Sequence, residues 1–173
     1  MPDAPLQFAP PWGSKNAWQE VHGNIGYHIQ RYQAELKPVV TIARRARVRL
    51  ETVFELLDDI CAATCSRCPD PCCLTASPWY DFRDLIFLHL NRFAIPLTQP
   101  IETYRAVCSY LSSRGCTLPR PIRPWICTWY LCPVQTASLR NRGPDRYKTF
   151  NRTVQEIKGY RRRLEDGFVR IIV

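Results

Sequence analysis

Cysteine spacing is the chemically most informative feature of this sequence. Two thiols separated by two residues, as in Cys65 and Cys68, can chelate one metal centre because a turn points both sulfurs inward. An adjacent cysteine pair follows at once, and three more cysteines stand in a second, distant segment. The sequence therefore predicts one metal or iron–sulfur centre held by two segments, with these candidate ligands: Cys65, Cys68, Cys72, Cys73, Cys116, Cys127 and Cys132.

The metal-ligand set can be narrowed by packing arguments. Adjacent cysteine side chains are expected to diverge, so one member of the pair ligates, and we choose Cys73 over Cys72. The expected metal ligands are then Cys65, Cys68, Cys73 and Cys127. Ordinary buried roles are expected for two cysteines that fall inside predicted helices, and structural roles for the histidines: Cys61, Cys108, His22, His28 and His89.

Residues beside the cysteines favour an iron–sulfur cluster. Arg67 and Arg123 would offset the negative charge of a thiolate-bound cluster, while Trp125 and Trp129 would exclude water. Cysteine followed by proline, as at Cys68, also occurs in ferredoxin-type loops. We expect a 4Fe-4S cluster, with zinc as the alternative cofactor because both centres accept four thiolates.

The stretch CSRCPDPCC resembles the CxxCxxCC signature of the YkgJ-like cysteine-cluster family, a zinc- or iron-chelating domain, with one extra residue before the pair. Members of that family also carry a downstream cysteine followed by Arg-Pro-x-x-Cys, which Cys116 and residues 123–127 match. The resemblance covers residues 61–133 and implies a bound iron–sulfur cluster or zinc. A related motif occurs in flagellin lysine N-methylases, but no glycine-rich nucleotide fingerprint supports that activity here.

The elements that must position these thiols read as mostly α: a small helical bundle with two irregular Cys/Pro-rich loops that enclose the centre. One domain, 1–173, is expected. Its parts are an irregular arm at 1–14 docked through Phe8 and Trp12, long helices at 15–60, the cysteine-cluster region at 61–133, and a C-terminal helix and tail at 144–173.

Within these parts the pattern predicts finer elements. The long helices form either an antiparallel pair or one helix kinked at Pro38. Further helices are expected over 80–93 and 99–113, an extended loop over 116–134, and a strand or coil over 168–173.

Charge points to anionic partners. Lys and Arg number 24 against 15 Asp and Glu, a formal charge of +9. We expect an acidic redox or client protein as partner, with nucleic acid as the alternative through the arginine-rich helix faces at 43–49 and 160–163. The alternative is that these helix faces are exposed to solvent and bind no partner. No secretory signal and no long apolar run is present, so we expect a cytoplasmic protein with reduced thiols and no membrane partner.

These features favour an accessory iron–sulfur protein that transfers electrons or delivers or senses a cluster. A zinc-stabilised module that binds nucleic acid or protein is the first alternative, and an iron–sulfur enzyme is the second. No catalytic residue is assigned, because spacing places no nucleophile beside a base among the candidate acids: Asp58, Asp59, Asp81 and Asp84.

Overall fold

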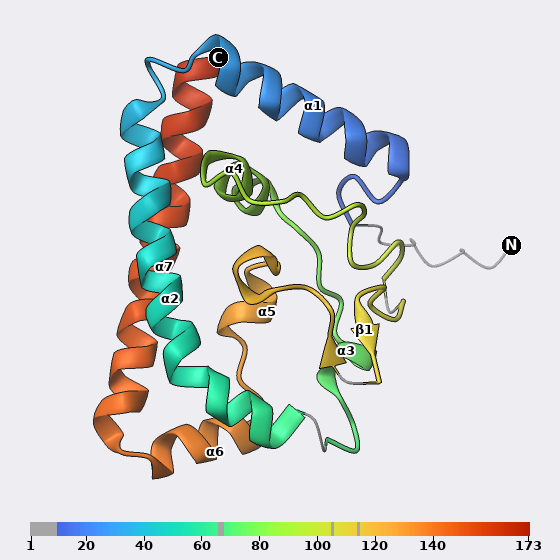
Figure 1. Ribbon diagram of the computed structural model, residues 1–173, viewed down its shortest axis with the longest axis vertical. Coiled ribbons are helices and arrows are strands. Elements are labelled where there is room, and N and C mark those ends of the chain that lie inside the picture. The colour runs from blue at the N-terminus through green and yellow to red at the C-terminus, as the bar shows by residue number, and fades with distance from the viewer. Residues whose placement is uncertain (1–9, 66–67, 105, 114) are drawn as a thin grey trace, which may run out of the picture.

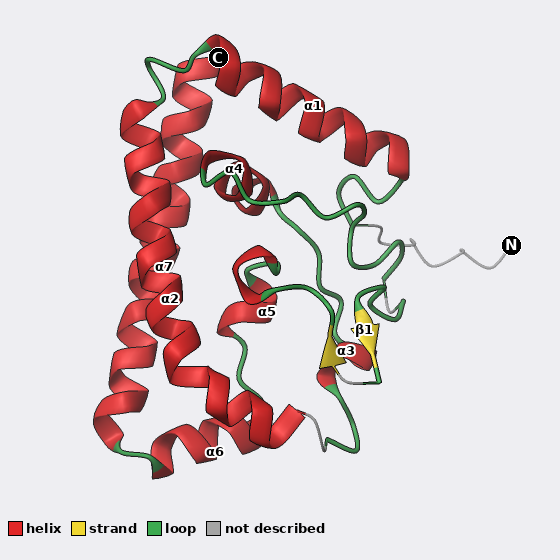
Figure 2. Ribbon diagram, in the orientation of Figure 1, coloured by secondary structure: helices red, strands yellow, loops and turns green. Residues whose placement is uncertain are grey.

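The computed structural model describes residues 10–65, 68–104, 106–113 and 115–173. Within these ranges the fold is mostly helical, with one two-stranded antiparallel hairpin (Figures 1 and 2). In chain order the elements are α1 (Lys15–Arg31), α2 (Lys37–Cys65), α3 (Cys72–Thr75), α4 (Phe82–Leu90), β1 (Leu111–Ser112), β2 (Gly115–Cys116), the 3-10 helix η1 (Arg120–Ile122), α5 (Ile126–Trp129), α6 (Pro133–Asn141) and α7 (Pro144–Ile172).

The long helices α2 and α7 pack side by side and run in opposite directions (Figure 1). Each buries residues at alternating steps of three and four, the spacing that keeps one seam facing a partner helix. On α2 the seam is Val39, Ala43, Ala46, Leu50, Val53, Leu57 and Ile60, and on α7 it is Phe150, Val154, Ile157, Arg161, Leu164 and Phe168. A Cβ atom on Gly167 would lie 3.2 Å from Val39 Cγ2, so the two helices approach closely at this end.

The predicted long N-terminal helices form as two separate elements. Ser14 caps α1, because its side chain accepts a hydrogen bond from Ala17 N at 3.2 Å. A turn over residues 32–36 then separates α1 from α2, so the single kinked helix is wrong. The helices do not form the expected pair either, since α1 packs on α4 while α7 is the long partner of α2.

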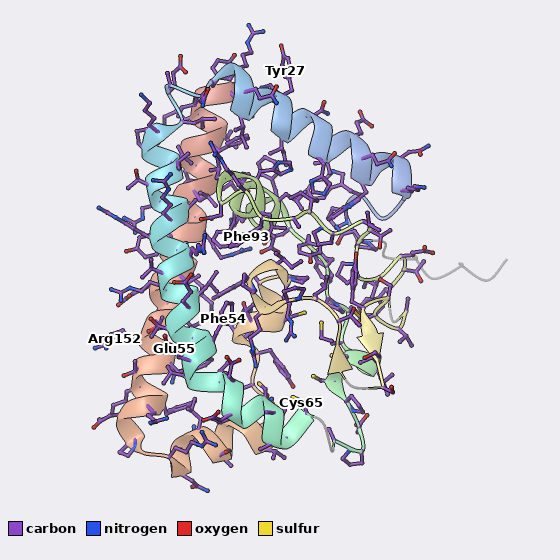
Figure 3. All side chains as sticks on the ribbon, in the orientation of Figure 1. Tyr27, Phe54, Glu55, Cys65, Phe93 and Arg152 are labelled. Atoms are coloured by element: carbon purple, nitrogen blue, oxygen red, sulfur yellow. The ribbon has the colours of Figure 1, made fainter. Side chains whose placement is uncertain are left out.

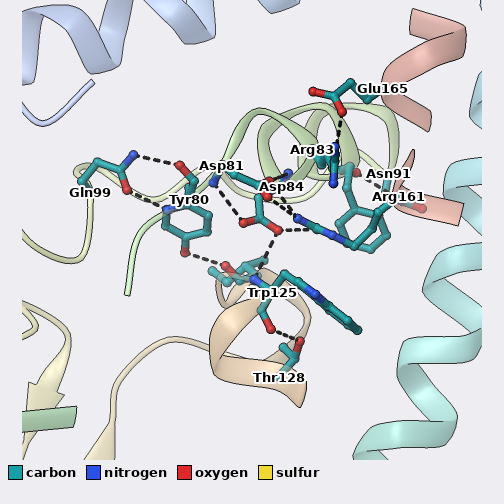
Figure 4. Close-up of polar contacts among 12 residues, drawn as sticks. Tyr80, Asp81, Arg83, Asp84, Asn91, Gln99, Trp125, Thr128, Arg161 and Glu165 are labelled. Atoms are coloured by element: carbon teal, nitrogen blue, oxygen red, sulfur yellow. Dashed lines mark hydrogen bonds and ion pairs between the residues drawn. The ribbon is translucent and has the colours of Figure 1, made fainter. Parts of the chain in front are cut away.

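One arginine stands in the α7 seam where the pattern would place an apolar residue. The Arg161 side chain is 7% exposed and donates hydrogen bonds to Asp84 Oδ1 at 2.5 Å and to both Asp81 carboxylate oxygens at 2.7 and 2.8 Å (Figure 4). Asp81 and Asp84 also form the capping box that begins α4. Asp84 Oδ1 accepts a further bond from Trp125 N at 3.2 Å, so this ion pair connects α7, α4 and the start of α5.

Residues 99–113 do not form the predicted helix. The buried Gln99 side chain instead bonds the backbone on both sides of Tyr80, accepting from its N at 2.8 Å and donating to its O at 3.1 Å. Gly115, with φ +101°, was expected to follow a helix but begins β2 of the hairpin, where it pairs with Ser112. Proline and glycine are typical of helix ends and of hairpins alike, and in this segment a hairpin forms instead of a helix.

Other boundaries also differ from the sequence prediction. The last segment, 168–173, continues α7 almost to the chain end because Phe168 keeps the buried spacing. Within the expected extended loop at 116–134 the structure has β2, η1 and α5, and Pro133 begins α6, which the sequence analysis missed. Trp12 packs against the core as expected, whereas Phe8 lies outside the described residues. None of the described helices has the length and apolar character needed to cross a bilayer.

The buried arginine gives a first prediction. Replacing Arg161 with Met leaves Asp84 without its cation in a buried site, so we expect the free energy of unfolding at pH 7.5 to fall by about 3 kcal/mol. Arg162→Met is the matched control because its side chain is exposed, and it should cost less than about 0.5 kcal/mol. Urea denaturation followed by circular dichroism measures both. Equal losses in the two variants would contradict the role given to Arg161.

The same carboxyl predicts a pH dependence. Burial raises the pKa of Asp84 to about 6 from 3.8, although Arg161 acts in the opposite direction. As the pH rises, the unfolded chain therefore loses this proton before the folded chain does, and folding becomes less favourable between about pH 4 and 6. Relative to Asp84→Asn, which does not titrate, the wild-type protein should lose up to about 3 kcal/mol of unfolding free energy over this window. A relative gain over the same window would show that the pKa is lowered instead.

Candidate metal centre

All nine cysteines lie within the described residues and none forms a disulfide. They gather between the C-terminal end of α2 and the segments that carry α3, β2, α5 and the start of α6; Figure 3 labels Cys65 at the end of α2. We divide seven of them into two groups by their contacts. The Gln135 thiol group comprises Cys61, Cys65 and Cys132, and the α5 thiol group comprises Cys72, Cys73, Cys116 and Cys127.

The Gln135 thiol group surrounds a buried amide on α6. Gln135 Nε2 lies 3.1 Å from Cys65 Sγ and 3.4 Å from Cys61 Sγ, close enough to donate to either sulfur. Cys132 is the N-cap of α6, and its sulfur accepts from Gln135 N at 3.5 Å in place of the usual cap oxygen. Cys61 thus faces the site and is not merely a core side chain, and Gln135 is a residue that the sequence analysis missed.

The α5 thiol group is recognised by mutual electrostatic effects. Desolvation, and then the neighbouring Cys116 and Cys108 thiols, raise the pKa of Cys127 to about 12. The pKa of Cys73 is also raised, first by a hydrogen bond with Cys72, then by burial and by the neighbouring Cys72, Cys127 and Cys116 thiols. Thiols on three separate elements, α3, β2 and α5, therefore lie within electrostatic reach of one another.

The side chains of the adjacent residues Cys72 and Cys73 are arranged differently from the sequence prediction. A hydrogen bond between the two thiols lowers the pKa of Cys72 to about 6 while it raises that of Cys73. Their side chains therefore do not diverge, and neither can be dismissed as a ligand on that ground. Cys72 also contributes to the raised pKa of Cys65, after the larger effects of burial and Cys61, so the two thiol groups are neighbours.

A backbone hydrogen bond links the two cysteines of the CxxC motif. Cys68 N donates to Cys65 O at 3.3 Å, which joins the two ends of the motif, and the Cys68 residue is exposed. Arg67, which was expected to offset the charge of a cluster, lies with Ser66 outside the described residues.

The donor atoms have the right chemistry for a thiolate-bound metal, but they are not assembled into a ligand shell. Across the described ranges, no set of three or more His, Cys, Asp or Glu side chains is arranged so that it could hold a metal ion. The predicted set Cys65, Cys68, Cys73 and Cys127 is therefore not brought together as such. Ligation requires the thiols to approach one another more closely than they do in this structure.

The residues expected around the centre have distinct positions. Arg123 acts on Cys127 and lowers the pKa of that thiol, against the larger effect of burial, and its Nε donates to Leu118 O at 2.9 Å. Trp125 and Trp129 flank Cys127 at the two ends of α5. Both line a cavity of about 270 Å³, together with Ser77, Trp79, Asp81, Asp84, Ile126 and Lys158. The tryptophans predicted to exclude water from Cys127 flank it along the chain, but Cys127 itself is exposed.

The candidate acids all have arginine partners. Asp81 and Asp84 bind Arg161, Asp58 pairs with Arg120, and Asp59 Oδ2 lies 3.5 Å from an Arg142 nitrogen. These ion pairs engage carboxylate oxygens that a general base would need for its substrate proton. The structure accordingly gives no reason to assign a catalytic residue among them.

Two histidines form a pair that spacing did not indicate. His22 Nδ1 and His89 Nε2 lie 2.9 Å apart, so one ring donates and the other accepts. Burial, and then the neighbouring His89, lower the pKa of His22 to about 4, and burial lowers that of His89. Both rings are therefore neutral at physiological pH, in keeping with the structural role expected of them.

Comparison with known proteins adds no relative to this description. The chain matches no protein-family model, no curated protein and no solved structure. The resemblance to the YkgJ-like cysteine-cluster family therefore stays a prediction that rests on the cysteine motifs of residues 61–133.

Proposed function

We propose that this protein is an accessory iron–sulfur protein that transfers electrons or delivers or senses a cluster. The observation that supports the proposal is that Cys73, Cys116 and Cys127 lie on three different elements but close enough to affect one another's charge. Cys116 and Cys127 raise the pKa of Cys73, and Cys116 raises that of Cys127. These three thiolates are the proposed ligands, and the CxxC turn supplies the fourth through Cys65 or Cys68. A cluster held by thiolates supplies one-electron chemistry at a potential that the protein sets.

The surrounding residues would act on such a centre in identifiable ways. Hydrogen bonds to sulfur stabilise its negative charge, and Gln135 Nε2 already lies 3.1 Å from Cys65 Sγ. Arg123 supplies positive charge beside Cys127, and Trp125 and Trp129 flank Cys127 along the chain, but the Cys127 residue is itself exposed to water. Adjustable charge and hydration matter for a redox centre and much less for structural zinc, which favours iron–sulfur over the zinc alternative.

The proposed ligation also gives the weakly structured site a physical role. Its short elements α3 and α5 have four residues each, too few to be stable as isolated helices. Metal binding would therefore contribute directly to the order of this region, as it does in many small metal domains. The long helices need no such support, because they bury their own apolar seams.

Metal content and spectrum test the proposal directly. Protein purified without oxygen should carry about four iron and four sulfide per chain and show a visible charge-transfer band that dithionite bleaches. Colourless protein with stoichiometric zinc would replace the cluster by the zinc alternative. Material free of both metals would refute a thiolate-bound centre.

Serine variants test the ligand assignment. Cys73→Ser and Cys127→Ser should each lose most of the iron, since serine is a poor ligand for it, while the circular dichroism of the long helices persists. Cys132→Ser is the matched control: Cys132 caps α6, and serine caps a helix well, so iron content and helicity should both be kept. Full iron loading in Cys73→Ser and Cys127→Ser would show that other residues bind the cluster.

A further inference from the structure

An arginine stripe on α2 and a tyrosine of α7, which are far apart in the sequence, line one surface of the molecule. Residues 41, 44, 45, 48 and 49 of α2 follow one another at helical spacing and form a stripe on a different face from the buried seam of that helix. Tyr160 of α7 lies against this stripe, and together they line a groove of about 450 Å³. We call it the α2–α7 groove, lined by Thr41, Arg44, Arg45, Val48, Arg49 and Tyr160.

The groove carries positive charge that the protein does not neutralise. No carboxylate is among the six lining residues. Arg44 and Arg45 are exposed, and neither makes an ion pair with any residue that the structure describes. Arg49 is held at the edge by Glu156 at 2.9 Å. Like charges on one helix face repel, so a bound polyanion would relieve a cost that the folded chain retains.

An aromatic ring and an apolar side chain stand beside this charge. Tyr160 is the one aromatic residue of the six, and it is half-buried against the core, which fixes its ring. The Arg163 guanidinium carbon lies over that ring, 4.7 Å from its centre, so a base that stacks on this face must displace the exposed Arg163 side chain. Val48 is 57% exposed between the arginines. The groove thus offers guanidinium groups and a flat ring within one stripe about 12 Å long.

We propose that the α2–α7 groove binds single-stranded nucleic acid, with Arg44 and Arg45 on neighbouring phosphates and Tyr160 against a base. Guanidinium groups match phosphate geometry, and an aromatic ring stacks on bases that are not already paired. An acidic protein or an anionic membrane surface would use the arginines but would have no need of the ring. This proposal uses no cysteine and is independent of the metal centre.

Binding is measured by fluorescence anisotropy with the full chain and a labelled single-stranded 12-mer of uridine. The logarithm of the association constant should fall linearly with the logarithm of salt concentration. Arg44→Gln/Arg45→Gln removes two phosphate contacts, so the slope should decrease by about 1.4 and affinity at low salt by about tenfold or more. Arg162→Gln/Arg170→Gln is the control, with the same change of charge at exposed arginines outside the groove, and should change the slope by less than half as much.

The ring is tested separately. Tyr160→Leu should weaken binding by about 5- to 100-fold with an unchanged salt slope, and Tyr160→Phe should restore most of it. Thermal unfolding of each variant is compared with the wild type, because Tyr160 also packs on the core. If Tyr160→Leu unfolds, the Phe variant and a base-paired 12-mer decide the point: binding to the duplex should be weaker than to the single strand.

Three outcomes would overturn the proposal. Equal losses in the two double arginine variants would mean general attraction of a basic protein for any polyanion. Tighter binding of polyglutamate than of the 12-mer would assign the groove to an acidic polypeptide. Preference for phosphatidylserine vesicles over the 12-mer, with no effect of Tyr160→Leu, would assign it to an anionic lipid surface.

Discussion

The structure depends most on the buried ion pair of Arg161 with Asp84 and Asp81. It stands in the middle of an otherwise apolar seam on α7, where a charge is costly unless it is fully paired. Its partners begin α4, and Asp84 also accepts from Trp125 N. The requirement to satisfy one buried charge therefore fixes how α4 and α5 meet the pair of long helices.

This constraint reaches the candidate metal centre through short elements. Trp125 precedes α5, on which Cys127 lies, and the Arg161 guanidinium carbon is 5.3 Å from the centre of the Trp125 ring. The Tyr80 hydroxyl donates to Ile122 O at 2.6 Å. This bond holds η1, which precedes α5, against the segment that leads into α4. The thiol-bearing segments thus take their positions from side-chain hydrogen bonds to the helical frame, since their own backbone hydrogen bonds are few.

The long elements could be predicted from sequence because each repeats an apolar spacing, which α2 and α7 keep over their whole length. Prediction from sequence failed where hydrogen bonds of polar side chains determine the local structure. The seam position of Arg161 breaks the apolar pattern, and Gln99 replaces the helix expected over 99–113 by bonds to Tyr80. Cysteine spacing predicted the region of the candidate site, but Gln135 carries no spacing signal, and only folding brings it to Cys61 and Cys65.

The long helices α2 and α7 and the thiol-bearing segments have different structural roles. This difference explains how one small chain can present both the arginine stripe and the cluster of thiols. The seam on α2 needs only one face of the helix, and the arginine stripe uses another, so charge can accumulate there without disturbing the core. The thiols lie on segments whose geometry the frame fixes only at a few points, such as Asp84 with Trp125. The proposed metal centre would need this freedom to close around its metal, whereas the proposed nucleic-acid groove would need the rigidity of two packed helices.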